Sequence, residues 1–114
     1  MVNVTLRQAT SLEYGTAVLG TTVLLVLGHT GCGAVKAAIE GKEVPGQISA
    51  LYPHIQPAID HAGSDLAAVV KTNAEIQARL LRESSPVIRL MVKENKVKVV
   101  SGVYNIATGK VTLL

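Results

Sequence analysis

The chain has 114 residues, of which 48% are hydrophobic and 17% are charged. This length fits a single domain, residues 1–114, with one substantial core. The charged fraction is below the roughly 25% of an average globular protein, so we expect a homo-oligomer that buries apolar surface between subunits. A net charge of +3 without a dense basic run, and three aromatic residues in all, argue against a nucleic-acid partner.

The cellular location is predicted from cysteine usage and from the apolar segments. Cys32 is the single cysteine and cannot form an internal disulfide, which favours the reducing cytoplasm. The N-terminal residues lack the positive-then-apolar layout of a signal peptide. The most apolar run, residues 17–27, is too short to span a bilayer, so no membrane partner is expected.

The first third of the chain predicts a helix, a strand and a glycine-rich turn. Thr10 and Glu13 fit a capping box, with Thr10 as the N-cap of a helix that ends near residue 19. The run TVLLVL at 22–27 is apolar and β-branched, which predicts a central parallel strand buried on both faces. The turn GHTGCG at 28–33 follows, at the carboxyl end of that strand, where open α/β sheets carry their functional groups.

The remaining elements follow in chain order. After a short helix at 34–39, helical segments are expected at 47–62, interrupted near Pro53 and Pro57, and then at 65–82 and 86–93. Ser85 and Pro86 have the residue types of an N-cap and a first helical position. The alternating KVKVVSGVY at 96–104 predicts a strand, and a turn at 105–109 leads to a closing strand at 110–114.

These elements predict an α/β fold: a small, mostly parallel sheet flanked by helices, with a C-terminal antiparallel hairpin. The strand at 22–27 has too few partners, because a central strand needs a neighbour on each side and two other strands are predicted. Either another subunit covers the open edge, or the fold lacks a segment. Asn73 and Gln77 share one helix face and are interpreted as structural.

The turn carries the one motif with the character of a metal site. His29 and Cys32 offer an imidazole and a thiolate three positions apart, which are the ligand types that Zn²⁺ accepts. Gly31 and Gly33 let the backbone bend so that both side chains point the same way. Taken alone the motif is weak, because a turn histidine followed by a buried cysteine that binds nothing is more common.

The wider sequence around the motif is more specific. SLEYGTAVLGTTVLLVLGHTGCGAVKAA at 11–38 resembles the central motif region of β-class carbonic anhydrases. The segments 73–77, 85–88 (SPVI) and 98–114 (KVVSGVYNIATGKVTLL) resemble the last helices and final hairpin of the same family, in the same order. The resemblance therefore extends over the chain from about Thr10 onwards.

The resemblance implies a zinc enzyme that has lost half of its site. The family holds zinc with two cysteines and one histidine, and zinc-bound hydroxide converts CO2 reversibly to bicarbonate. By this resemblance His29 and Cys32 are two of the ligands. The family's Cys-x-Asp-Ser-Arg segment, which supplies the other cysteine and an Asp/Arg pair, is missing from this sequence, which indicates an N-terminally truncated member.

Two functions therefore stay open. One is zinc-dependent hydration of CO2 that is weak or lost. The alternative is a non-catalytic oligomeric homologue that binds a metal or small anion at the His29–Cys32 turn. In that case the N–H groups around Gly31 and Gly33 are available to an anion. A third hypothesis is that another chain supplies the missing segment. Tyr14 and Tyr104 are weaker candidates for lining a pocket. Candidates for a third ligand, from this chain or a second subunit, are Glu13, His54, Asp60, His61 and Asp65.

Overall fold

The computed structural model of the protein describes residues 6–114. Its elements in chain order are α1 (Leu6–Ala17), β1 (Val23–His29), α2 (Gly33–Glu40), a 3-10 helix η1 (Ile48–Leu51), α3 (Tyr52–Ala62), α4 (Leu66–Ser84), α5 (Pro86–Lys93), β2 (Lys98–Asn105) and β3 (Lys110–Leu113). None of the helices within these residues is long and apolar enough to cross a membrane.

The strands form one three-stranded sheet in the order β1-β2-β3. β1 runs parallel to β2, with Val23 opposite Lys98 and His29 opposite Tyr104. β2 and β3 form an antiparallel hairpin. The α/β class, the parallel pair and the C-terminal hairpin are thus confirmed.

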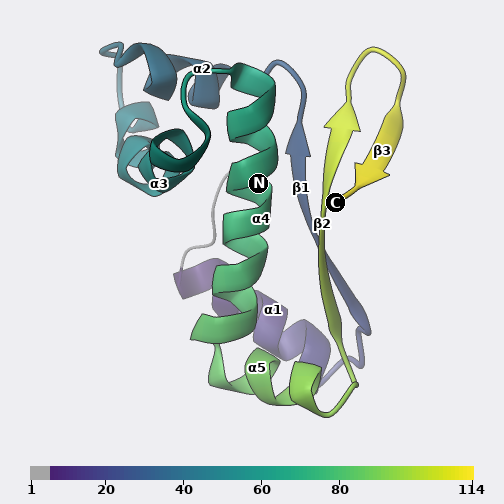
Figure 1. The fold of residues 1–114 in the computed structure, drawn as a ribbon. Helices are drawn as coiled ribbons and strands as arrows, with labels where there is room; N and C mark the ends of the chain where they lie inside the picture. Colours follow the sequence, from purple (N-terminus) through teal and green to yellow (C-terminus); the bar gives the residue numbers. More distant parts are fainter. Residues whose placement is uncertain (1–5) are drawn as a thin grey trace.

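Helix α4 lies along one face of the sheet and organises both cores (Figure 1). α2 and α3 pack beside one end of α4, and α1 and α5 pack beside the other. The core at the α1 and α5 end contains Leu24, Val26, Ala74, Ala78, Leu81, Ile88, Val97 and Val99. The core at the α2 and α3 end contains Cys32, Val35, Ile55, Ala58, Val69 and Val70.

Side-chain caps fix where α4 and α5 begin. Asp65 accepts a hydrogen bond from the backbone N–H of Ala68 at 3.0 Å, and Ser85 accepts one from the N–H of Ile88 at 3.3 Å. Pro86 follows as the first residue of α5, where a missing N–H costs nothing. Both helix starts agree with the sequence prediction.

Three sequence expectations about the helices are wrong. Thr10 is not an N-cap, since it lies inside α1, which is already helical at Leu6 and ends at Ala17. The Glu13 carboxylate, expected to complete the capping box, instead accepts a hydrogen bond from Ser85 Oγ at 2.7 Å, a tertiary contact that local patterns do not reveal. α3 is not interrupted by proline, because Pro53 lies in its first turn and the helix continues through Pro57.

β1 is an edge strand of the sheet within residues 6–114, not a central one. Leu24 and Val26 are buried on the face toward α4, whereas Val23 and Leu25 on the other face are 52% and 44% exposed. Within residues 6–114, β1 therefore pairs with another strand along one edge only, in line with the shortage of strands that the sequence indicated.

Candidate metal centre

The candidate site is the turn that joins β1 to α2. β1 ends at His29 and α2 begins at Gly33, with Cys32 in the N-cap position. Gly31 between them has φ +67, a left-handed conformation that favours glycine and reverses the chain direction. The turn is thus short, and both candidate side chains lie next to a regular element.

The turn is tied to the C-terminal hairpin by two hydrogen bonds. The N–H of Thr30 donates to the carbonyl of Tyr104 at 2.9 Å, which extends the β1–β2 pairing by one residue. The Thr30 hydroxyl oxygen accepts a hydrogen bond from the N–H of Ile106 at 3.1 Å. These contacts hold the middle of the turn against the end of β2.

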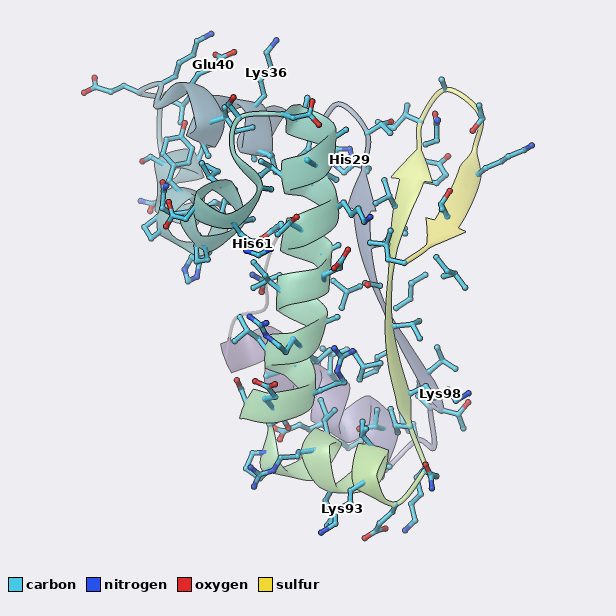
Figure 2. All side chains as sticks on the ribbon, viewed as in Figure 1. His29, Lys36, Glu40, His61, Lys93 and Lys98 are labelled. Carbon is cyan, nitrogen blue, oxygen red and sulfur yellow. The ribbon has the colours of Figure 1, made fainter. Side chains whose placement is uncertain are left out.

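His29 and Cys32 line the same small cavity, of about 40 Å³. Its other lining residues come from β1, α2 and α4, namely Leu27, Gly28, Val35, Val70, Asn73 and Ala74. Figure 2 shows His29 at the end of β1, beside α4. The space is large enough for a single ion or water molecule.

A backbone contact sets the orientation of the imidazole. His29 Nδ1 lies 3.0 Å from the carbonyl oxygen of Thr30, and since a carbonyl can only accept, Nδ1 carries the proton. The neutral ring then has its lone pair on Nε2. Metal-binding histidines are commonly held in this way by a carbonyl or carboxylate on the second nitrogen.

Cys32 lies deeper than His29. Its exposed fraction is 6%, and its neighbours in the core are apolar, among them Val35, Ile55 and Val70. The thiol is not engaged in a disulfide. Such burial is typical of a packing cysteine, and it also excludes water from one side of any ion bound at the cavity.

Within residues 6–114, no third candidate ligand joins His29 and Cys32. Among residues 6–114, no group of three or more His, Cys, Asp or Glu side chains is placed to hold one ion. Asp65 caps α4 and Asp60 accepts a hydrogen bond from Gln56 at 2.8 Å. His61 lines a different groove with Arg79 and Leu114, and Figure 2 shows it well apart from His29.

None of the third-ligand candidates of the same chain (Glu13, His54, Asp60, His61 and Asp65) joins His29 and Cys32 in such a group within residues 6–114. The described residues bring together two candidate ligands at most, fewer than the three or four that a firm zinc site needs. By themselves they do not fit a fully coordinated zinc ion.

The other sequence candidates have simpler positions. An added Cβ at Gly31 or at Gly33 would meet no atom within 4 Å, so the outer side of the turn is open to a small anion. Tyr14 is 57% exposed, and neither Tyr14 nor Tyr104 lines the cavity beside His29.

The sequence interpretation missed Asn73, which is buried and lines that cavity from α4. The i, i+4 spacing of Asn73 and Gln77 shows a shared helix face but not what that face covers.

Taken together, the fold and the turn define an α/β protein with an imidazole and a thiol at the carboxyl end of a parallel strand. The family model for carbonic anhydrase matches residues 1–111, and the chain belongs to that family. No curated protein matches the chain.

Solved β-carbonic anhydrases share the fold. A structure from a study of two tetrameric enzymes of Sordaria macrospora has a TM-score of 0.85 at 19% identity and covers 96% of this chain. The Coccomyxa enzyme in complex with acetazolamide has a TM-score of 0.78 at 25% identity and covers the whole chain. Wild-type CafD of Aspergillus fumigatus has a TM-score of 0.75 at 21% identity and also covers the whole chain. The chain spans 60%, 56% and 69% of the length of these proteins, respectively.

Proposed function

We propose that this chain is a β-carbonic-anhydrase-like protein in which His29 and Cys32 are half of a zinc site, and in which reversible hydration of CO2 to bicarbonate is weak or lost. The observation that supports the ligand pair is the cavity of about 40 Å³ that both residues line. Zinc, when bound by this family, supplies hydroxide at neutral pH by lowering the pKa of its water.

The loss of efficient hydration follows from the donor set. The sequence has one cysteine and no Cys-x-Asp-Ser-Arg segment, and the described residues bring no third ligand to the cavity. Two protein ligands leave the ion weakly held, because zinc affinity rises with each ligand that the fold fixes in place. The described residues supply no further ligand to the ion.

Self-association is part of the proposal. The Sordaria enzymes are described as tetrameric, and this chain exposes apolar side chains on β1 and β3 that include Val23, Leu25 and Leu113. We also expect the chain to reside in the cytoplasm, since Cys32 is a free thiol.

The alternative is a non-catalytic homologue that binds a metal or small anion at the turn. The lack of a third ligand favours it, as do the open space at Gly31 and Gly33 and the adjacent N-terminus of α2. The two functions differ in whether bound zinc turns over CO2 at all.

Metal analysis after equilibrium dialysis against zinc, followed by stopped-flow CO2 hydration, tests the proposal. We expect the wild-type chain to retain zinc, and the Cys32→Ser and His29→Ala variants to lose it. His61→Ala is the matched control, because His61 lies outside the cavity, and it should retain zinc like the wild type.

Hydration by the zinc-loaded chain should be at or near the background rate. Zinc retention that Cys32→Ser leaves unchanged would refute the ligand assignment. Rapid hydration that disappears in Cys32→Ser would show a competent enzyme and overturn the proposed loss. Failure to retain zinc would leave the non-catalytic alternative.

A further inference from the structure

We infer that Thr30 is a positioning residue for His29. Through Thr30, the hairpin loop (residues 106–109) holds the imidazole in the tautomer that carries its proton on Nδ1. The inference deepens the proposed function and rests on it for the use of that tautomer, which leaves the Nε2 lone pair to a metal ion. The tautomer itself is a property of the metal-free chain and is measured without zinc.

The contact to the imidazole comes from the next residue in the chain. His29 Nδ1 lies 3.0 Å from the Thr30 carbonyl oxygen, which favours a proton on Nδ1. A neutral imidazole can carry its proton on either nitrogen, and the hydrogen bond that one nitrogen makes decides the state of the other. The position of the Thr30 carbonyl therefore decides which nitrogen of His29 has the lone pair.

The turn alone does not hold this carbonyl in place. The peptide plane that contains it leads into Gly31, which has φ +67 and lacks the Cβ that restricts the backbone of other residues. The Thr30 side chain is exposed, so packing in a core does not fix this residue. The carbonyl has to be held by contacts with another part of the chain.

The C-terminal hairpin supplies two such contacts. The N–H of Thr30 donates to the carbonyl of Tyr104 at 2.9 Å, and Thr30 Oγ1 accepts a hydrogen bond from the N–H of Ile106 at 3.1 Å. The first contact holds the peptide that precedes Thr30, and the second holds its side chain. Because χ1 of a β-branched residue is stiff, a fixed Oγ1 also limits the movement of the Thr30 backbone and of its carbonyl.

The hairpin loop presents the N–H of Ile106 as a helix presents its first N–H. Asn105 Oδ1 accepts hydrogen bonds from the N–H groups of Ala107 at 2.9 Å and Thr108 at 3.3 Å, in the manner of an N-cap. In a capped turn of this kind the N–H of the first residue finds no acceptor within the turn. Thr30 Oγ1, 76 positions away in the chain, is the acceptor for Ile106.

The contact from Ile106 is exposed, and we expect it to act on the imidazole more than on the stability of the fold. The loss of one neutral hydrogen bond changes a local equilibrium by about two- to tenfold. Removing this contact should therefore raise the ratio of Nε2-protonated to Nδ1-protonated His29 by about that factor. A role in folding alone would leave the ratio in the folded protein unchanged.

Ile106→Pro removes the donor and leaves both His29 and Thr30 unaltered. Proline suits this position, because the preceding residue, Asn105, lies in a strand and position 106 corresponds to the first residue of a capped turn. Ile106→Ala is the matched control, since it removes the same side chain, which is 60% exposed, and keeps the N–H. Thr30→Val is the second variant, in case proline impairs folding, and Thr30→Ser should restore the acceptor.

The ¹⁵N NMR signals of the imidazole nitrogens at alkaline pH report the tautomer, and the spectrum of His29→Ala assigns them. We expect the wild type, Ile106→Ala and Thr30→Ser to carry the His29 proton mainly on Nδ1. The Nε2-protonated form should increase about two- to tenfold in folded Ile106→Pro and Thr30→Val, while the signals of His54 and His61 on α3 stay the same. An unchanged ratio in both variants, or a wild-type ring protonated mainly on Nε2, would overturn the inference.

A zinc titration of the same variants separates this inference from the proposed function. If both hold, the zinc affinity of Ile106→Pro and Thr30→Val should fall by at least about twofold relative to Ile106→Ala and Thr30→Ser. A wild-type chain that binds no zinc would contradict the proposed ligand pair and leave the tautomer result standing. Zinc binding that depends on Cys32, together with an unchanged tautomer in the variants, would overturn the positioning role alone.

Discussion

Gly28→Ala is expected to destabilise the fold because β1 and α4 meet there without room for a side chain. A Cβ added at Gly28 would lie 2.9 Å from Val70 Cγ1, 3.4 Å from the Val70 carbonyl oxygen and 3.7 Å from Ala74 Cβ. Val70 is 5% exposed and β-branched, so its χ1 is essentially fixed in a helix and the methyl cannot rotate away. The strand and the helix must therefore separate.

The expected cost is about 1–3 kcal/mol, the usual penalty for inserting one methyl group into a packed core. Alanine restricts the unfolded chain more than glycine does, and this effect raises the free energy of unfolding by about 0.4–1 kcal/mol. The net loss of stability is therefore about 1–2 kcal/mol. With an m-value of about 2 kcal/mol per molar urea, the denaturation midpoint should fall by about 0.5–1 M.

Urea denaturation followed by circular dichroism measures this loss, and Gly33→Ala is the matched control. Gly33 is the first residue of α2, an added Cβ there meets nothing within 4 Å, and its φ is not positive. We expect its midpoint to stay within experimental error of the wild type or to rise slightly.

The double variant Gly28→Ala with Val70→Ala isolates the contact. Removing the Val70 methyl groups costs stability by itself, but in that background Gly28→Ala should cost at least about 0.5 kcal/mol less than it does alone. The steric explanation fails if Gly28→Ala matches the Gly33→Ala control, or if the two substitutions at 28 and 70 are simply additive.

Three further substitutions test contacts that position the helices and the hairpin, each by urea midpoint. Ser85→Ala should cost about 2 kcal/mol, because it removes both the cap of α5 and the hydrogen bond to Glu13; a loss below about 0.5 kcal/mol would contradict both roles. Asp65→Ala should cost about 1 kcal/mol by removing the acceptor for the N–H of Ala68, whereas Asp65→Asn should retain most of the stability, and equal effects would argue against a capping role. Asn105 Oδ1 accepts two turn N–H groups at 2.9 and 3.3 Å, so Asn105→Ala should cost about 1 kcal/mol, and Asn105→Asp should restore stability if acceptance is the cause.

Local chemistry predicted most of the fold. The apolar run at 22–27, the serine and proline at 85 and 86, and the alternation after residue 96 each identify an element from its own residues, and the structure contains all three. The shortage of strands was also visible in the sequence, because a run this apolar is unusual at an edge. Among residues 6–114 the structure contains three strands and places β1 at an edge of the sheet.

Long-range contacts account for the expectations that failed. Glu13 has the spacing of a capping box, but the Glu13 carboxylate accepts a hydrogen bond from Ser85, which lies 72 positions away in the chain. β1 extends past its apolar run to His29, because Gly28 fits against Val70 and the pairing with β2 continues to Tyr104. Neither contact can be predicted from a short stretch of the sequence.

For the candidate site, the motif identified His29 and Cys32, and the structure adds the cavity that they share. The metal assignment itself remains a prediction. Asn73 was interpreted as a structural residue on one helix face with Gln77, and its place at the cavity depends on the axial position of α4 against β1. A sequence pattern does not specify that position.

The attachment of Thr30 to Tyr104 and Ile106 makes the C-terminal segment a structural support for the turn. A chain shortened after residue 105 would keep the imidazole and the thiol but would lose the N–H of Ile106 that steadies the loop between them. Ion-binding assays on shortened variants of this protein should therefore keep Tyr104 and Ile106 in place.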